Sequence, residues 1–230
     1  MAEHSELVKK HFDIKYKDYD KLIRNLIPNY EAMHKKVVSL INFPKDKKID
    51  ILDLGIGTGK TALDLLKKFP NVHIEGIDIS KNMIEQGKIR LKGYSNKINF
   101  EFLNMINFIS KPLKFDVCVS VLSIHHLNLK EKQKLFSKIF DSLKEKGIFV
   151  IGDIINFDTK KETEEKEQEW KSFLIKNLGK NEGDFWFRNY QEEDLPDSIN
   201  NQLKWLKNAG FRKIDCIWQF MNYAVFYGRK

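Results

Sequence analysis

Three glycines at alternate positions, Gly55, Gly57 and Gly59, follow the apolar run 49–54 and precede a helix-like run over 60–69. Such glycines let a loop turn tightly and let a ligand approach the backbone without meeting a Cβ atom. The start of the helix beyond them offers free N–H groups to a polar ligand. The pattern therefore predicts a site for a nucleotide-like cofactor, with a glycine-rich turn that binds nothing as the alternative.

The spacing of these glycines can be compared with that of two known phosphate-binding loops, the P-loop and the dinucleotide fingerprint. A P-loop needs its first glycine at position 54, which is Leu54, and a dinucleotide fingerprint needs its third at position 60, which is Lys60. Neither pattern is present. What stands is D-x-G-x-G-x-G, from Asp53 to Gly59.

An acidic residue then follows at a suitable distance. The strand-like run 72–77 ends in Asp78, 19 residues after Gly59. In a βαβ unit this spacing places a carboxylate beside the glycine loop, where it can accept hydrogen bonds from both ribose hydroxyls. The alternative role, a helix N-cap, suits Ser80 better. We therefore predict that Asp78 binds a ribose.

A histidine pair, His125 and His126, follows the strand-like run 115–121. A histidine at this edge could serve as a general base, because its pKa suits proton abstraction near neutral pH. Adjacent side chains diverge on a strand or helix, so the spacing does not by itself indicate a metal chelate. We expect one histidine to face the pocket and the other to hold the loop, and no metal; a metal site that includes Asp153 is the alternative.

The elements that must position these residues follow from the hydrophobic periodicity. Residues 5–42 have helical spacing, interrupted at Pro28. Strand-like runs then alternate with helical ones, which predicts a parallel sheet covered on both faces. The last two strand-like runs are too close for a helix between them, so one must run antiparallel. The predicted strands are 49–54, 72–77, 98–103, 115–121, 147–154, 213–218 and 223–227, and the predicted helices after residue 48 are 60–69, 81–92, 131–144 and 198–208.

A segment rich in charge and aromatic residues separates the fifth strand from the final pair. The charge run 159–169 leads into Trp170 and Phe173, and Phe185, Trp186 and Phe187 follow. An insertion here lies over the carboxyl ends of the strands, so its aromatics either line a substrate pocket or seal the insertion onto the body. We predict one domain over 1–230, made of N-terminal helices (1–47), a cofactor-binding core (48–155), a substrate-side insertion (156–202) and a closing helix and hairpin (203–230).

Composition limits the partners. The formal charge is +8, but only five of the 40 basic residues are arginine, and the lysines are interleaved with glutamates. A solvated surface fits this better than a nucleic-acid interface, so nucleic acid is an unlikely partner. No apolar run is long enough to span a membrane, and no signal peptide is evident. Two cysteines in apolar runs suggest a reduced, cytoplasmic protein. The oligomeric state stays open between a monomer and a homodimer.

The motif from Asp53 to Gly59, followed by Asp78, resembles the first part of the class I S-adenosylmethionine (SAM)-dependent methyltransferases. The resemblance implies a Rossmann-like α/β fold with a seven-stranded, mostly parallel sheet, helices on both faces and an antiparallel C-terminal hairpin. It also implies SAM as cofactor. The residues it assigns to the cofactor are Asp53, Gly55, Gly57 and Gly59 in the loop, Asp78 and Ile79 at the ribose, Asn104 and Met105 at the adenine, Ser120 near the methionine part, and Tyr19 and Arg24 closing over it.

The reaction implied is transfer of a methyl group to a small-molecule acceptor by in-line displacement, with His125 or His126 as the candidate base. The fold and cofactor site do not determine the acceptor. Two alternatives stay open, an RNA methyltransferase and a SAM-binding protein that transfers no methyl group.

Overall fold

A computed structural model describes residues 19–230. The predicted helical residues 5–18 lie outside this range, and the described part of that segment is helical as expected. The helices are α2 (Tyr19–Leu26), α3 (Tyr30–Leu40), α4 (Lys60–Lys68), α5 (Lys81–Arg90), α6 (Leu129–Ser142), α7 (Lys160–Leu178), α8 (Lys180–Glu193) and α9 (Ile199–Asn208). The strands are β1 (Ile49–Leu54), β2 (Val72–Asp78), β3 (Ile98–Phe102), β4 (Phe115–Val121), β5 (Leu143–Ile154), β6 (Arg212–Phe220) and β7 (Tyr223–Arg229), and short 3-10 turns are η2 (Lys92–Tyr94), η3 (Met105–Asn107) and η4 (Ile124–His126).

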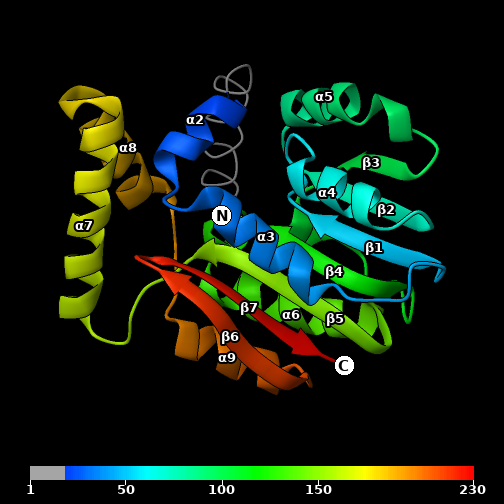
Figure 1. Cartoon of the computed structure of the whole chain (residues 1–230). Helices are drawn as coiled ribbons and strands as arrows, with labels where there is room; N and C mark the ends of the chain where they lie inside the picture. The colour runs from blue at the N-terminus through cyan, green and yellow to red at the C-terminus, as the bar shows by residue number, and fades with distance from the viewer. Residues whose placement is uncertain (1–18) are drawn as a thin grey trace.

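The strands form one seven-stranded sheet in the order β3-β2-β1-β4-β5-β7-β6 (Figure 1). The first five strands pair in parallel, whereas β7 runs antiparallel to both β5 and β6. This confirms the predicted sheet and its antiparallel C-terminal hairpin. The turn between β6 and β7 is too short for a crossover helix, which is why the direction reverses there.

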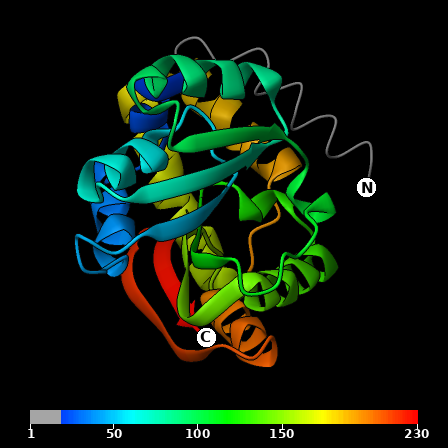
Figure 2. The ribbon, with the colours of Figure 1, turned by 90° about the vertical axis from the view of Figure 1, so that its right-hand side faces the viewer.

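Helices cover both faces of the sheet, as predicted. Figure 1 shows α3, α4 and α5 on one face and α6 and α9 on the other, and the turned view of Figure 2 keeps α5 above the strands and α9 below them. Successive strand residues enter opposite cores: Ile51 and Val117 belong to one apolar cluster, Leu52 and Cys118 to the other. Burial on both sides explains why these strands are apolar throughout rather than alternating.

From β1 the sheet extends in one direction through β2 and β3, and from β4 it extends in the other direction through β5. This reversal leaves a crevice at the carboxyl ends of β1 and β4. The register brings three strand ends together. Leu54 at the end of β1 pairs with Ile77 on β2 and with Ser120 on β4. The glycine loop, Asp78 and the histidine turn η4 all follow these ends, so the sheet gathers them at one edge.

The insertion between β5 and β6 is helical. Its charge run forms the first half of α7, and Gly179, at φ 83°, separates α7 from α8. Both helices stand beside α2 at one end of the molecule (Figure 1). Trp170 on α7 is buried, and its indole N–H donates to the Leu26 carbonyl at 2.8 Å. The insertion is therefore fastened to the N-terminal helix across the opening of the crevice.

Two predicted boundaries move by a few residues. Helix α6 begins at Leu129 rather than 131, because Asn128 caps it in a reciprocal capping box with Glu131. Strand β5 begins at Leu143 rather than 147, because Leu143 already pairs with Phe115 ahead of an irregularity in the ladder. Within residues 19–230, every helix is too short or too polar to cross a bilayer.

Candidate active site

A cavity opens beside the glycine loop, and we call it the glycine-loop cavity. Eight of the residues that the sequence predicts for the site line this cavity. Its lining residues are Tyr19, Gly55, Gly57, Ile77, Asp78, Ile79, Met83, Leu103, Asn104, Met105, Val121, Leu122, Ser123, His126 and Leu127.

Gly57 and Asp78 form the polar floor of this cavity. Gly57 has φ 54°, and a Cβ atom placed on it would meet nothing within 4 Å, so the loop leaves open space on that side. Its N–H donates to Asp78 Oδ2 at 2.8 Å, and the Ser80 N–H donates to Oδ1 at 2.9 Å. The carboxylate is thus held at the rim of the loop with capacity to accept further hydrogen bonds.

Asn104 and Met105 also line this cavity, where β3 leads into η3. Asn104 caps that turn, because its Oδ1 accepts the Ile106 N–H at 3.1 Å. An amide oxygen can accept two hydrogen bonds. Met105, the first residue of the turn, also lines the cavity.

Four other predicted residues do not line either of the cavities described here. Gly59 is the left-handed N-cap of α4, and a Cβ there would approach Leu91 Cδ1 at 2.7 Å. Ser120 is fully buried and donates to the Leu54 carbonyl at 2.9 Å. Arg24 points to the surface and pairs with Glu31 at 3.0 Å. Gly59 and Ser120 shape the backbone around the site, and Arg24 stands away from it.

Asp53 is the fourth of these residues. Its side chain is buried and its Oδ2 has no hydrogen-bond partner among the described residues. Burial, with a smaller contribution from the neighbouring Asp78 carboxylate, raises the pKa of Asp53 from 3.8 to about 8. The folded protein therefore keeps this acid neutral at pH values where the unfolded chain ionises it.

This shift predicts a pH-dependent cost in stability. Because the folded pKa of Asp53 is raised, its contribution to the free energy of unfolding falls as pH rises from about 4 to about 8. Asp53→Asn removes the titration. We expect its melting temperature to exceed that of the wild type by roughly 2–6 °C at pH 8.5 and to match it near pH 4. Scanning calorimetry across this range is the measurement, and a difference that does not vary with pH would contradict the prediction.

A second cavity adjoins the first, and we call it the aromatic cavity. It lies between α2, the insertion and η4, and it shares Tyr19, Leu122 and His126 with the glycine-loop cavity. Its lining residues are Tyr19, Leu22, Ile23, Leu26, Ile27, Leu122, His125, His126, Ile154, Trp170, Trp186, Asn189, Tyr190, Glu193, Asp194 and Tyr223. Of the insertion aromatics, Trp170 and Trp186 line this cavity whereas Phe187 packs into the core, and a substrate pocket here stays a prediction.

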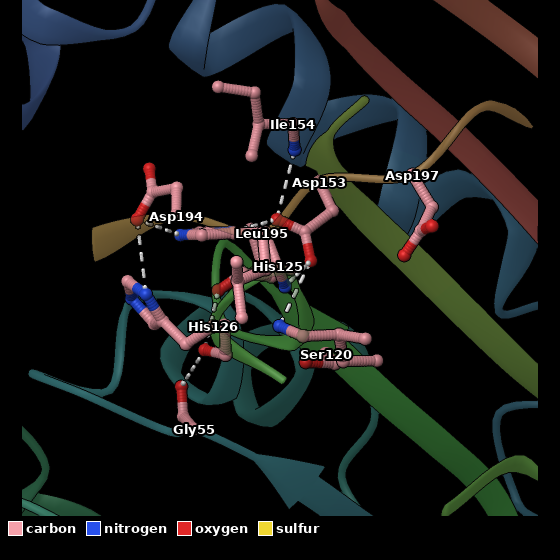
Figure 3. A network of polar contacts seen from close by, with 12 residues as sticks. Gly55, Ser120, His125, His126, Asp153, Ile154, Asp194, Leu195 and Asp197 are labelled. Atoms are coloured by element: carbon pink, nitrogen blue, oxygen red, sulfur yellow. Dashed lines mark hydrogen bonds and ion pairs between the residues drawn. The ribbon is translucent and has the colours of Figure 1, made fainter. Parts of the chain in front are cut away.

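The two histidines differ in their nearest carboxylate, Asp153 for His125 and Asp194 for His126, and Asp194 Oδ1 also lies 3.6 Å from His125 Nε2 (Figure 3). His125 Nδ1 lies 2.5 Å from Asp153 Oδ1, and Asp153 Oδ2 accepts the backbone N–H groups of Ile124 and His125 at 3.0 and 3.1 Å. Burial opposes protonation of His125, but the carboxylates of Asp153 and Asp194 outweigh it and raise the pKa of His125. Asp153 therefore fixes η4 on the end of β5.

His126 borders both cavities and pairs with Asp194 at the end of α8. The His126 Nδ1 to Asp194 Oδ1 distance is 3.1 Å, and Figure 3 shows the imidazole beside this carboxylate. Burial, together with the neighbouring His125, lowers the pKa of His126 despite the opposing effect of Asp194. A neutral imidazole whose Nδ1 hydrogen points to Asp194 has a lone pair on Nε2, so it can accept a proton there.

A cation could also be held by this group. One ligand atom each from His125, His126 and Asp194 lies within 4.8 Å of the other two. Adjacent histidines were expected to diverge, but on η4 the ring centroids of His125 and His126 lie 4.1 Å apart. Asp153 was the carboxylate named in the metal alternative, but its oxygens are engaged by His125 and by backbone N–H groups. The expected absence of a metal stays a prediction.

The structure adds contacts that the sequence did not indicate. Asp194 reaches the histidines only because the Leu195 N–H donates to the His125 carbonyl at 2.8 Å. Leu122 ends the segment from Ser120 that the family resemblance predicts near the methionine part; it lines both cavities and has φ 54°, which is unusual for a residue with a side chain. Asp20 accepts a hydrogen bond from Thr58 Oγ1 and forms an ion pair with Arg90, so α2 is clamped over the glycine loop. No local sequence signal marks these contacts, because each joins distant segments.

Known proteins share this fold. Residues 51–147 match the family described as "Methyltransferase domain". Haemonchus contortus phosphoethanolamine N-methyltransferase 2, solved with S-adenosyl-L-methionine, superposes with a TM-score of 0.73 at 16% identity and covers 99% of this chain. The chain spans about 60% of the length of that solved protein.

Two curated relatives are similar in sequence. Carboxy-S-adenosyl-L-methionine synthase of Nautilia profundicola is 28% identical over 220 residues, which covers 92% of this chain and 90% of that protein. Phosphoethanolamine N-methyltransferase of Plasmodium falciparum is 29% identical over 175 residues, which covers 74% of this chain and 64% of that protein.

The fold and the family match together define the class. Residues 51–147 match the methyltransferase domain, and the chain has the class I Rossmann-like fold of the SAM-dependent methyltransferases; it is an enzyme that uses SAM, as its glycine motif suggested. Its relatives are of the small-molecule type. The glycine-loop cavity fits the cofactor, because Gly57 leaves a space that any Cβ would enter and Asp78 offers carboxylate oxygens to hydroxyl groups.

Proposed function

We propose that this protein transfers the methyl group of SAM to a small-molecule acceptor that binds in the aromatic cavity. The observation that supports this most directly is the shared wall of the two cavities, formed by Tyr19, Leu122 and His126. A cofactor in one cavity and an acceptor in the other would meet at this wall. Enclosure by α2 and the insertion suits a small acceptor better than a nucleic acid.

The chain's own residues would hold the cofactor along the carboxyl edge of the sheet. Asp78 would accept the ribose hydroxyls, and the backbone at Gly55 and Gly57 would follow the methionine part. Asn104 and Met105 would contact the adenine, with Tyr19 closing over the top. When bound, SAM supplies a methyl group on a positively charged sulfur, and the reaction needs no nucleophile from the protein.

The remaining task of the protein is to position the acceptor and accept its proton. His126 Nε2 would take the proton of the attacking group, while Asp194 orients the ring through Nδ1. The apolar and aromatic walls would exclude water during transfer. His125, held by Asp153, would keep the turn in place.

The first test is direct. Isothermal titration calorimetry of the full chain should detect binding of SAM and of its demethylated product, S-adenosylhomocysteine. Incubation with SAM and a panel of small amines, phenols and thiols should release S-adenosylhomocysteine and one methylated acceptor, with or without EDTA. Binding without any transfer would favour the non-methylating alternative, and transfer only to RNA would favour the RNA alternative. Failure to bind either compound would overturn the proposal.

Replacing His126 tests its proposed role as the base. We expect His126→Ala to lower kcat by roughly 10- to 100-fold near pH 7, because proton removal then depends on water. The deficit should shrink as pH rises and the acceptor loses its proton unaided. A pH–rate profile of the variant and the wild type gives this measurement. A deficit that stays constant up to pH 10 would indicate a structural role instead.

A second candidate function comes from the similar proteins named carboxy-S-adenosyl-L-methionine synthase, which align with most of this chain. Such an activity would leave a carboxylate next to the cofactor sulfur. Among residues 19–230, the linings of both cavities contain no lysine or arginine to pair with it. Mass spectrometry separates the two functions, because carboxylation adds a carboxyl group to SAM whereas methyl transfer releases S-adenosylhomocysteine. We favour methyl transfer.

A further inference from the structure

The aromatic cavity has a composition that discriminates among acceptors. Five of its lining residues are aromatic, and they come from α2, the insertion and β7. Trp170 lies edge-on to Tyr190 and to Tyr223, with ring centroids 5.0 and 6.1 Å apart. Rings arranged in this way present negatively charged faces as well as apolar surface, and both suit an alkylated or protonated amine.

The charged groups in the lining are acidic. Glu193 and Asp194 contribute carboxylates at the end of α8, and within residues 19–230 the lining contains no lysine or arginine. His125 carries a raised pKa but lies against Asp153, which offsets its charge. His126 has a lowered pKa and is neutral near pH 7. The tyrosines stay protonated, since burial raises the pKa of Tyr190 and of Tyr223.

We infer that the acceptor is an amine whose remaining part is uncharged and apolar, without a phosphate or carboxylate group. This inference rests on the proposed methyl transfer. The negative walls and aromatic faces would attract the ammonium form, and the apolar residues of α2, including Leu22 and Leu26, would contact the rest of the molecule. An anionic group would meet the two carboxylates with no basic side chain of residues 19–230 in the lining to pair with it.

The chemistry balances with the residues at the shared wall. The ammonium group first gives a proton to His126 Nε2, which leaves a lone pair on nitrogen. That lone pair forms the new carbon–nitrogen bond, the carbon–sulfur bond breaks, and its electron pair stays on sulfur. The methylated nitrogen is then positively charged again and the sulfur is neutral. His126 then releases its proton to solvent, and the methylated nitrogen needs to lose a second proton only before a further methylation.

The test measures binding to the complex of the full chain with S-adenosylhomocysteine by calorimetry, using three probes that share a phenethyl skeleton and a fourth, phosphoethanolamine, that shares only the two-carbon amine. These are phenethylamine, phenethyl alcohol without the charge, phenylalanine with an added carboxylate, and phosphoethanolamine with a phosphate. We expect phenethylamine to bind about tenfold more tightly than the alcohol and the two anionic probes to bind more weakly still. With SAM in place of the product, phenethylamine should yield its N-methyl derivative.

A charge-neutral variant provides the matched comparison. Asp194→Asn keeps the shape of the side chain and should weaken phenethylamine binding about tenfold while leaving phenethyl alcohol unchanged. Glu192→Gln, on the exposed side of the same helix end, should leave both unchanged. Tighter binding of phenylalanine or phosphoethanolamine than of phenethylamine would overturn the inference and leave methyl transfer intact. Failure of S-adenosylhomocysteine itself to bind would overturn the proposed function as well.

Discussion

Asp78→Ala should raise the dissociation constant for SAM by roughly 100- to 1,000-fold, because it removes two charge-assisted hydrogen bonds at the proposed ribose site. The same carboxylate accepts the Gly57 N–H at 2.8 Å, so its loss also frees the glycine loop. Asp78→Asn keeps one acceptor oxygen and should lose about tenfold. Calorimetric titration of SAM into each variant measures the effect.

The control for this prediction is an exposed carboxylate on the neighbouring strand. Glu101 on β3 pairs in register with Ile77 on β2, one residue before Asp78. Glu101→Ala removes a similar charge from the same edge of the sheet and should change the affinity by less than about twofold. If the Asp78 and Glu101 variants bind SAM equally well, Asp78 does not hold the cofactor.

Asp153→Ala should lower the free energy of unfolding by about 3–5 kcal/mol. The carboxylate is 2% exposed and accepts backbone N–H groups from Ile124, His125 and Ile154 as well as the His125 ring. Alanine leaves these donors buried without an acceptor, and no water reaches them readily. Urea unfolding followed by circular dichroism gives the difference.

The size of this loss should depend on pH. The pKa of His125 is raised in the folded state, so the stability from its charged pairing is fully present below the unfolded pKa, about 6.5. That part is lost as pH rises through the folded pKa, so the gap between the wild type and Asp153→Ala should narrow. Asp141→Ala, an exposed acid on α6, should cost less than about 0.5 kcal/mol at every pH. A similar cost for both variants would contradict the prediction.

The fold and the class of cofactor could both be predicted from the spacing of residues along the chain. The glycine spacing from Asp53 to Gly59, the distance to Asp78 and the alternation of strand and helix each depend on backbone geometry within one βαβ unit. That geometry is the same in any surrounding structure, so it can be predicted from residue types alone. The seven-stranded sheet and its reversed last strand are confirmed for the same reason.

Individual site residues were less predictable. The sequence placed Ser120, Gly59 and Arg24 at the cofactor, but none of them lines a cavity described here. The Ser120 hydroxyl donates to the Leu54 carbonyl, Gly59 is the left-handed N-cap of α4, and Arg24 pairs with Glu31 at the surface. The distinction between the histidines was also beyond the sequence. Each was a candidate base. The contacts that give them different environments are those with Asp153 on β5 and with Asp194 at the end of α8.

The sequence by itself determined the Rossmann-like sheet and SAM as the cofactor, and it predicts that a glycine loop and an acid at adjoining strand ends bind that cofactor. Only the tertiary structure decided what faces that loop. Asp194, Trp186 and Tyr190 reach the second cavity because α8 folds back against α7 and the Leu195 N–H binds the His125 carbonyl. Such contacts join segments far apart in the chain, and their geometry depends on the packing of the whole molecule rather than on any local period.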